Sequence, residues 1–383
     1  MNFNDFLRSA ARRLLPKCTT AIEFSVSKQE KILDSVQPPK DDVERSFAQY
    51  YCQKKLFGKR THFFSCAAAV VFLLPKLLLT SFSEEKTKSN GIFVSENIPE
   101  NVIPNELKEE VGSIVPIKQY NLECFDKEDR RFFFRLWKRH PFALPFLFKC
   151  LIKIRLYSAL IKKYDPKVII TCNEFSYTSS VLTLYCEEKG VEHVDVMHGE
   201  KLFYIRDSFF RFHRCYVWSQ NYVDLFLRMR AEESQFRVAV PPSLLFEKTS
   251  VTPYCDYTYY LQEQSGDELK CIVTTMKTLV AQGNKVVFRP HPRFTPMKEL
   301  KELCGESGIE IEKNAEISIE ESVLRTGCVI SLFSTVLQQA HYNKVPIAID
   351  DISDPIILKK LQDRGYAMIQ APHQKLSELL EIK

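Results

Sequence analysis

The chain of 383 residues lacks the features that mark disulfide-bonded and zinc-binding proteins. Its 12 cysteines include no C-x-x-C pair, follow no regular spacing and form no Cys/His cluster. Several of them, for example Cys172 and Cys328, lie within apolar runs, where a free thiol packs as a small hydrophobic side chain. This cysteine usage predicts a protein of the reducing cytosol rather than a secreted one.

A long apolar run is also missing. The strongest candidate, 63–74 (FFSCAAAVVFLL), is interrupted by Pro75-Lys76 and is shorter than the roughly 20 residues that a spanning helix needs. Four basic residues precede it: Lys54, Lys55, Lys59 and Arg60. Two interpretations stay open, a buried helix of the N-terminal domain or a helix that dips into an anionic membrane face. The first residues, MNFNDFLRSAARRLLPK, lack the layout of a signal peptide.

The charge balance excludes little by itself. A net charge of +5 is too mild to indicate nucleic acid binding. Many of the basic residues lie in the first 160 positions, and 130–163 mixes Arg and Lys with Phe and Leu. This stretch fits either a basic amphipathic surface on anionic lipid or core helices whose Arg and Lys stems reach outward. An RNA-binding interpretation is disfavoured because no RNA-binding module is recognisable.

What the sequence does contain is a repeated strand, polar loop and helix. Expected strands at 92–94, 114–117, 167–171, 191–197 and 214–218 predict a parallel sheet covered by helices. Pro116 confines 114–117 to a sheet edge. Ligands of such sheets bind at the carboxyl ends of the strands, where Glu174, His198 and Glu200 fall.

A second series of strands and helices follows the polar stretch after Pro241-Pro242. Its expected strands are 257–261, 285–288, 308–310, 328–330 and 347–349, with helices at 271–281, 336–342, 355–361 and 375–380. We therefore predict an α/β protein with three parts. These are a helical and possibly membrane-associated segment (1–88), a first Rossmann-like domain (89–250) and a second Rossmann-like domain (251–383).

Two loops of the second domain carry the chemistry. The strand 285–288 runs into Arg289-Pro290-His291-Pro292-Arg293, where two prolines enforce a stiff loop and place one imidazole between two guanidiniums. The strand 328–330 leads to Ser334-Thr335, the expected N-cap of a helix. A helix start at the end of a parallel strand is a ready anion site, so we expect both loops to hold one phosphate. The alternative is a rigid surface turn and an ordinary helix cap.

The motifs resemble those of a known enzyme group. His291-Pro292 looks like the HP motif, and Ser334-Thr335 like the Ser-Ser/Thr motif, of bacterial GT-B transferases that use CMP-activated sugar acids. These are the sialyltransferases, polysialyltransferases and Kdo transferases. The resemblance implies two Rossmann-like domains that face a central cleft, of which the first (89–250) would bind the acceptor and the second (251–383) the nucleotide sugar. It also implies that His291 contacts the leaving phosphate as general acid and that Ser334 and Thr335 bind the same phosphate.

Other roles follow less directly from this resemblance. Glu320 or Glu321 would hold the ribose, and Arg289 and Arg293 would add phosphate contacts. The acidic motif that supplies the base in the group is not present in full. The nearest candidates for a base are Glu174, His198 and Glu200, each of which equally fits a cap or a loop-locking hydrogen bond.

We therefore expect an inverting glycosyltransferase that moves a CMP-linked acidic sugar onto a cell-surface glycan, as in capsule or lipopolysaccharide synthesis. No D-x-D motif is present, so no metal or other cofactor is predicted. The His-Gly pair at 198–199 also resembles CDP-glycerol and CDP-ribitol phosphotransferases, in which His198 would deprotonate the acceptor. A non-catalytic nucleotide-sugar or glycan-binding scaffold is a further alternative. The expected location is cytoplasmic, peripheral at the inner face of the cell membrane, with no nucleic acid partner.

Overall fold

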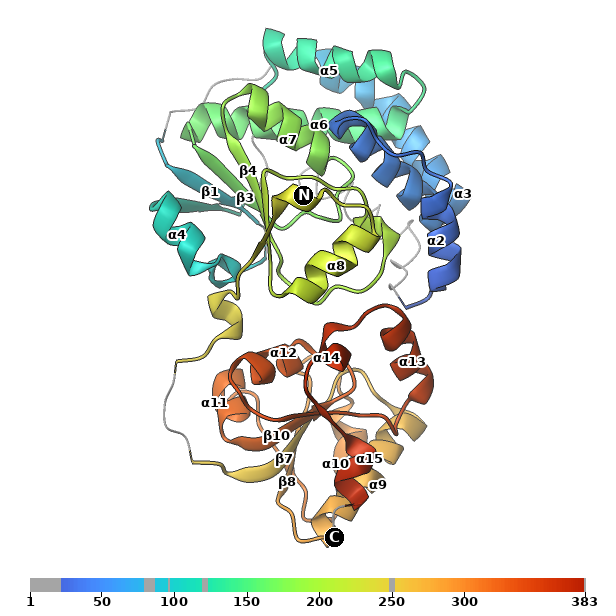
Figure 1. The fold of residues 1–383 in the computed structure, drawn as a ribbon, viewed down its shortest axis with the longest axis vertical. Coiled ribbons are helices and arrows are strands. Elements are labelled where there is room, and N and C mark those ends of the chain that lie inside the picture. The colour runs from blue at the N-terminus through green and yellow to red at the C-terminus, as the bar shows by residue number, and fades with distance from the viewer. Residues whose placement is uncertain (1–21, 79–86, 96, 119–122, 248–251, 382–383) are drawn as a thin grey trace. The chain divides into compact units, whose positions relative to one another are not determined.

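The computed structural model describes residues 22–78, 87–95, 97–118, 123–247 and 252–381. The chain divides into two compact units, of which the first ends at Pro241 and the second comprises Pro242–Lys383 together with Gly199–Leu202. Each unit contains a six-stranded parallel sheet with helices packed on it (Figure 1). The predicted α/β class with two Rossmann-like domains is confirmed. The prediction that the first residues are not a signal peptide concerns residues 1–17, which lie outside the described ranges.

The first sheet has the order β2-β1-β3-β4-β5-β6. Its strands are β1 (Gly91–Val94), β2 (Ile114–Ile117), β3 (Val168–Thr171), β4 (Glu192–Val196), β5 (Arg214–Val217) and β6 (Phe236–Val238). β2 forms the edge and pairs only with β1, as the missing N–H of Pro116 predicts. The short and largely exposed β6 has no apolar run and was not predicted.

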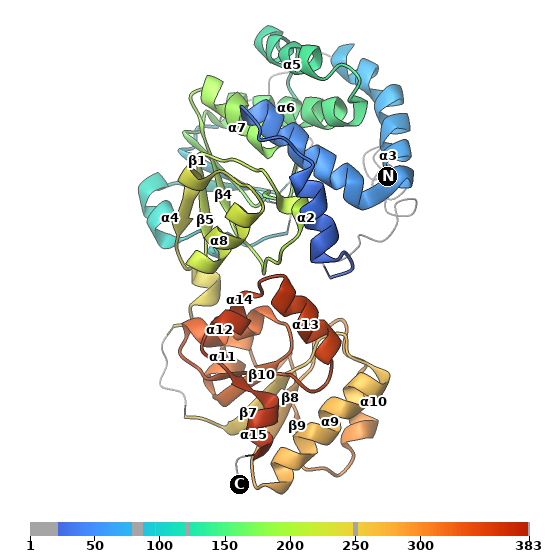
Figure 2. The same cartoon turned by 45° about the vertical axis from the view of Figure 1, so that its right-hand side comes forward.

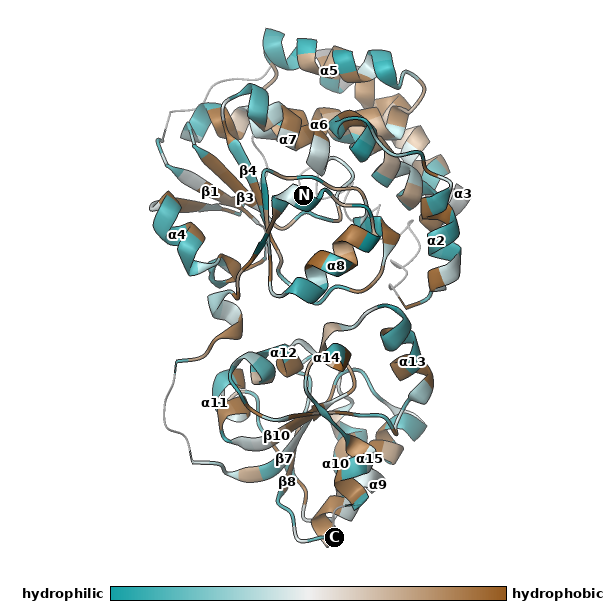
Figure 3. Ribbon diagram, in the orientation of Figure 1, coloured by the Kyte–Doolittle hydropathy of each residue, from teal (hydrophilic) through white to brown (hydrophobic). Residues whose placement is uncertain are grey.

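Helices cover both faces of this sheet. Ile92 and Ile169 contribute to a core shared with α6 (Leu144–Tyr164) and α7 (Ser179–Glu188). The alternate residues Phe93 and Ile170 face a second core that includes α4 (Asn105–Val111). Figures 1 and 2 show α6 and α7 on one side of the strands and α4 and α8 (Gln220–Arg228) on the other. The inner strand β3 (VIIT) is buried throughout and largely hydrophobic (Figure 3), because both faces of an inner parallel strand are covered.

The N-terminal helices belong to this first unit. Helix α2 (Val26–Asp34) leads into α3 (Asp42–Leu78), which bends at Gly58, where φ is 78°. Val43, Tyr50 and Leu73 of α3 join the core beneath α6. Between α3 and α6 in the chain lies the basic helix α5 (Lys127–Arg139). Among the described residues, no helix is long and apolar enough to cross a membrane.

The structure supports the buried interpretation for one side of each of the stretches 63–74 and 130–163. On the second half of α3, Ala69 and Leu73 are buried, whereas Phe63 is 67% exposed. Helix α6 is largely buried, with Leu147, Leu151 and ten neighbours in or against the core, whereas α5 exposes Arg131 and Lys138. Each stretch therefore has a core side and an outer side, and the outer side of α3 is apolar.

The second sheet has the order β12-β11-β10-β7-β8-β9. Its strands are β7 (Cys255–Tyr260), β8 (Val286–Arg289), β9 (Glu310–Ile311), β10 (Thr326–Ser331), β11 (Ile347–Ile349) and β12 (Gln374–Lys375). All pairings are parallel. The strand predicted at 308–310 begins only at Glu310, because Gly308 adopts a left-handed turn with φ of 77°.

The order of the second sheet creates a crossing point. The chain builds β7, β8 and β9 outward in one direction and then returns to place β10 on the other side of β7. Ligands of open α/β sheets bind where the strand order reverses, outside the carboxyl ends of the two central strands. In the second unit that position is the end of β7 and β10.

Seven helices cover the second sheet in the described part of the chain. They are α9 (Gly266–Ala281), α10 (Met297–Cys304), α11 (Ile319–Leu324), α12 (Thr335–Tyr342), α13 (Pro355–Asp363), α14 (Ala367–Gln370) and α15 (Leu376–Glu381). Helix α9 begins five residues earlier than expected, after Ser265. Short 3-10 turns occur at Glu100–Val102, Ile205–Asp207, Glu233–Gln235 and Pro242–Leu244.

One buried histidine connects the first sheet to its helices. His193 of β4 is completely buried, with Nε2 3.0 Å from the Tyr157 hydroxyl and Nδ1 2.9 Å from the Thr183 hydroxyl. Burial, assisted by the charges of His213 and Lys153, lowers the pKa of His193 to about 3. The imidazole is therefore neutral in the folded protein at all ordinary pH values.

This buried imidazole predicts an acid-sensitive first unit. In the unfolded chain, His193 binds a proton once the pH falls below its ordinary pKa of 6.5. In the folded chain, the same imidazole stays unprotonated until about pH 3. Stability that is present above pH 6.5 is thus lost as the pH falls, by up to about 1.4 kcal/mol per pH unit. We expect urea unfolding of the wild-type chain to lose about 2 kcal/mol between pH 7.5 and 5 through this group.

The fluorescence of Trp137 and Trp218 measures this effect, since both tryptophans of the chain lie in the first unit. A His193→Gln variant has no titrating group there and should show a smaller loss. Equal losses in the two proteins would contradict the assignment.

Candidate functional site

A cavity of about 330 Å³ lies at the crossing point of the second sheet. Its walls come from the ends of β7 and β8 and from the starts of α11 and α12, and comprise Tyr260, Leu261, Gln262, Arg289, Pro290, His291, Pro292, Asn314, Ile319 and Val336. The His291 loop and the first turn of α12, through Val336, therefore reach one cavity, whereas the predicted phosphate ligands Ser334 and Thr335 are not among its lining residues. The structure places it where the strand order predicts a ligand.

Hydrogen bonds hold the His291 loop in a defined shape. The backbone N–H of His291 donates to the Thr295 hydroxyl at 2.7 Å, and Nδ1 accepts from the backbone N–H of Arg293 at 3.2 Å. Phe294 stacks on the imidazole with 4.6 Å between ring centroids. Because Nδ1 is an acceptor here, the neutral ring carries its proton on Nε2, which is then a donor.

The start of α12 forms another part of the wall. Ser334 is the N-cap, as predicted, and its hydroxyl oxygen accepts from the backbone N–H of Val336 at 3.2 Å. Val336 lines the cavity, so the positive end of the helix dipole lies at that wall. Thr335, the first helical residue, is exposed.

Gln262 joins the two loops and was missed by sequence reasoning. Its Nε2 donates to the Ser334 hydroxyl at 3.1 Å, and its backbone carbonyl accepts from the Thr295 hydroxyl at 3.0 Å. Thr295 in turn holds the backbone of His291. A three-residue chain of hydrogen bonds thus fixes the imidazole relative to the helix start. The sequence feature that could have indicated Gln262 is its position as the first polar residue after the buried strand β7.

Arg289 is held by a buried carboxylate. Its guanidinium donates to Glu312 at 2.5 Å and to the carbonyl of Ile317 at 3.0 Å. Glu312 is 3% exposed and also pairs with Arg325 at 3.1 Å and with the Ser322 hydroxyl at 2.7 Å. The Arg289 side chain therefore forms part of the cavity wall in a fixed position, with its charge balanced by Glu312.

Tyr260 and Asn314 complete the wall. The Tyr260 hydroxyl bonds to the Ser322 hydroxyl at 2.8 Å, and burial raises the pKa of Tyr260, so the phenol stays protonated. Asn314 donates from Nδ2 to the carbonyl of Pro290 at 2.8 Å, which ties the His291 loop to the segment after β9.

The other residues predicted for phosphate or ribose lie outside this cavity. Arg293 contributes its backbone N–H to His291, and its side chain is exposed. The Glu320 carboxylate accepts from the backbone N–H of Glu247 at 3.0 Å, and Glu321 is 3.8 Å from Arg325. The cavity is reached from α11 by Ile319.

Two candidate bases lie in the first unit. Glu174 follows β3 and is 1% exposed, and its backbone carbonyl accepts from Gln49 at 2.9 Å. Burial by itself would lower the pKa of the nearby Arg206 guanidinium. The carboxylates of Asp207 and Glu174 have a larger, opposite effect, so the pKa of Arg206 is raised. His198 follows the neighbouring strand β4 and is half-buried. Both residues therefore belong to the carboxyl end of the first sheet.

Glu200, the third candidate, groups with the second unit. Its carboxylate accepts from the amide of Gln338 at 2.8 Å, and Gln338 lies on α12. The structure thus separates Glu200 from Glu174 and associates it with the helix that Ser334 caps. Sequence reasoning grouped the two by strand ends alone.

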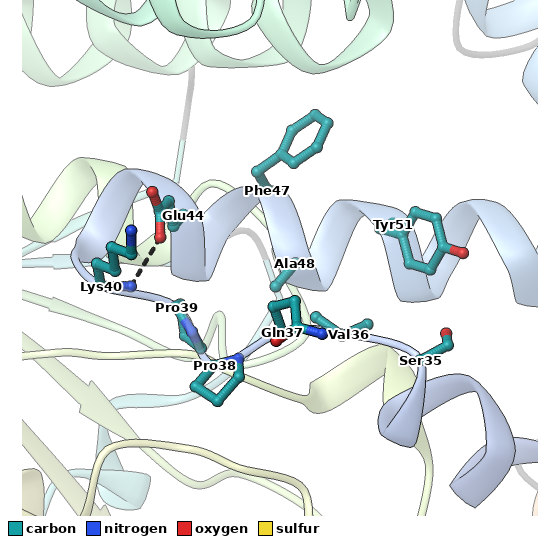
Figure 4. Close-up of a pocket in the computed structure, with 10 residues that line it drawn as sticks. All are labelled: Ser35, Val36, Gln37, Pro38, Pro39, Lys40, Glu44, Phe47, Ala48 and Tyr51. Atoms are coloured by element: carbon teal, nitrogen blue, oxygen red, sulfur yellow. Dashed lines mark hydrogen bonds between the residues drawn. The ribbon is translucent and has the colours of Figure 1, made fainter.

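Two further cavities lie in the first unit. The larger, about 380 Å³, is lined by the loop from α2 to α3, with Pro38 and Pro39, and by Phe47, Ala48 and Tyr51 of α3 (Figure 4). The Glu44 carboxylate accepts from the backbone N–H of Lys40 at its rim. The smaller cavity, about 280 Å³, involves Glu110 and Glu192, which are committed to Arg214. In the described residues, no group of three or more His, Cys, Asp or Glu side chains is arranged to hold a metal ion.

Comparison with known proteins finds likeness in structure alone. No protein-family model matches the chain, and no match was found among curated proteins. Similar solved structures include UDP-GlcNAc 2-epimerase from Neisseria meningitidis bound to UDP-GlcNAc (10% identity, TM-score 0.42, 77% of this chain and 90% of that one). Others are the lipopolysaccharide outer core galactosyltransferase WaaB (10%, 0.42, 76% and 93%) and the wall teichoic acid polymerase TagF (11%, 0.42, 85% and 89%).

All of these TM-scores lie below 0.5. The evidence for the fold is the pairing and order of this chain's own strands.

Proposed function

We propose that the chain is a glycosyltransferase that moves an acidic sugar of the sialic acid or Kdo type from a CMP-activated donor to a cell-surface glycan. The observation that carries the proposal is the cavity at the crossing point of the second sheet. His291 and the N-terminus of α12 share its wall there. A nucleotide phosphate is the ligand that suits a helix start and a neighbouring N–H donor.

The residues of the cavity fit the charge that develops during such a transfer. When the bond between the sugar carbon and the phosphate oxygen breaks, negative charge builds on the phosphate of the departing CMP. The Nε2–H of His291 and the Ser334 hydroxyl are preorganised donors, because Gln262 and Thr295 hold their positions. Fixed donors lower the barrier because they need no reorganisation as the charge appears.

The acceptor hydroxyl attacks the sugar carbon and must lose its proton. We propose Glu174 or His198 for this role, with Glu200 as the third candidate. Glu174 is buried just beyond the carboxyl end of β3, the edge of a parallel sheet at which ligands bind. Donor activation in this proposal uses protein groups and no metal ion or other cofactor.

Nucleotide titration tests the donor. We expect CMP to bind the wild-type chain more tightly than CDP or UDP, and to stabilise the second unit by about 2.7 kcal/mol at a concentration of 100 times Kd. Ser334→Ala should weaken CMP binding about tenfold, because a charge-assisted hydrogen bond contributes on the order of 1.4 kcal/mol or more.

Ser318→Ala is the matched control for this titration. Ser318 caps α11 in the same unit through a hydrogen bond from the backbone N–H of Glu321, whereas the Ser334 hydroxyl also accepts from Gln262 of the cavity wall. Both variants should lose about 1 kcal/mol of stability as cap deletions, but only Ser334→Ala should lose nucleotide affinity. Preference for UDP, or equal binding by the two variants, would contradict the proposal.

A further inference from the structure

Between Phe63 and Val71, the exposed side chains of α3 are all apolar. After the bend at Gly58, the helix buries one side against the first unit, at Ala69 and Leu73. On the opposite side, the described residues with the greatest exposure are Phe63 (67%), Phe64 (43%), Val70 (65%) and Val71 (59%). These four positions, with the exposed Ala67, share one side of the helix at 3.6 residues per turn. We call this surface the α3 face.

Such a face is unusual on a surface helix. A helix that packs on a globular domain normally carries charged or polar residues on the side away from the core. The sequence from 61 to 75, THFFSCAAAVVFLLP, contains no Lys, Arg, Asp or Glu at all. The two exposed Phe and two exposed Val side chains lie along one side of the helix and form an apolar patch. Such a patch marks an interaction surface.

The helices around α3 are strongly basic. Helix α3 packs along α6, where Phe72 and Phe148 stack with 6.4 Å between centroids, and α5 packs on α6. Residues 127–164, which contain α5 and α6, carry eleven Lys and Arg against two Asp and Glu. The whole chain has a net charge of only +5, so positive charge is concentrated in this part of the first unit.

Several of these cations are exposed. On α5, Lys127, Arg131 and Lys138 are exposed, and no ion pair involves them within the part of the chain that the structure describes. On α3, Lys54 is exposed and lies close enough to the start of the α3 face to act on His62, whose pKa is lowered by burial and then by the Lys54 charge. One exposed cation therefore lies near the start of the α3 face, and α5 adds further exposed cations to the same unit.

We propose that the α3 face docks on the surface of an anionic lipid bilayer, with its Phe and Val side chains entering the boundary between headgroups and acyl chains. An apolar stripe with basic neighbours is the pattern of a helix that lies in the plane of an anionic membrane. The stretch without charged residues, 61–75, is shorter than the roughly 20 apolar residues that a span needs, so in this proposal the helix lies on the bilayer. A protein partner of matching shape would not require the one-sided excess of positive charge. This proposal does not depend on the nucleotide that the second unit binds.

Vesicle co-sedimentation of the full chain tests it. We expect binding to vesicles of phosphatidylglycerol and phosphatidylethanolamine, at least tenfold weaker binding to phosphatidylcholine alone, and a marked loss at about 1 M salt, where the Debye length is about 3 Å. The double variant Phe64→Glu, Val71→Glu should reduce binding to the anionic vesicles at least tenfold. Its Tm should be unchanged, because both side chains are exposed.

Ile356→Glu is the matched control. Ile356 is 69% exposed on α13 in the other unit, so this variant adds a charge at an equally exposed apolar position and should bind vesicles as the wild type does. Light scattering of the same proteins separates the alternatives. Equal vesicle binding by the wild type and the double variant would overturn the proposal. So would a wild-type dimer that the double variant converts to a monomer, since the α3 face would then join two copies of the chain.

Discussion

Replacement of His291 by alanine is expected to lower the rate of sugar transfer by about 10²–10³, the cost of removing one preorganised donor from a developing negative charge. The imidazole lines the cavity and carries its proton on Nε2, because Nδ1 accepts from the Arg293 N–H. Its side chain is half-exposed and stacks only on Phe294, so the stability of the second unit should change little. The expected loss lies in kcat more than in KM.

Steady-state release of CMP with a purified donor and acceptor measures this effect. His341→Ala is the control, because His341 lies in the last turn of α12, away from the cavity wall formed by the helix start. Full activity of the His291→Ala protein would contradict the proposed role of His291 as a donor to the leaving phosphate. If CMP still bound as tightly as to the wild type, nucleotide binding would be shown to depend on other residues.

Replacement of Glu312 by alanine is expected to destabilise the second unit by about 3–5 kcal/mol, the usual cost of removing one member of a buried charge cluster. Glu312 holds Arg289 at 2.5 Å and Arg325 at 3.1 Å, and it accepts from the Ser322 hydroxyl at 2.7 Å. Without it, the buried guanidinium of Arg289 would have no carboxylate partner beside the His291 loop. Weaker nucleotide binding should accompany the loss of stability.

Far-UV circular dichroism in urea measures this loss, with tryptophan fluorescence as an internal reference because both tryptophans lie in the first unit. Glu310→Ala is the matched control, since Glu310 lies in β9, two residues before Glu312, and its contact with the Tyr254 hydroxyl is exposed. We expect the control to change stability by less than about 1 kcal/mol. A similar result for Glu312→Ala would show that the cluster is not a structural requirement of the cavity.

Local sequence patterns predict most of the two sheets. Runs of β-branched residues between turn signals mark β3, β8 and β11 because both faces of a parallel strand are buried and must be apolar. Pro116 correctly predicts that β2 is an edge strand. The prediction fails where a strand has little apolar content, as in β6, or where a glycine turn shifts its start, as Gly308 does for β9.

Residues that hold the cavity-lining groups in position are harder to recognise in the sequence than those groups themselves. The motifs of the His291 loop and of Ser334 are visible because proline and hydroxyl residues stand directly after apolar strands. Gln262, Thr295 and Glu312 stand in no motif, since they are 72, 4 and 23 residues from the groups that they hold. Their importance depends on hydrogen bonds formed only when β7, β8 and β9 lie side by side.

The amino-acid sequence by itself determined the α/β class, the edge position of β2, the cap of α12 and the stiffness of the His291 loop, because each follows from apolar periodicity, from proline or from a side chain near its own backbone. Tertiary structure decided which of the polar residues share a cavity. It placed Glu320 beside Glu247, paired Arg289 with Glu312 and left the apolar side of α3 uncovered. These outcomes depend on which elements pack together, and that is settled by contacts between residues far apart in the chain.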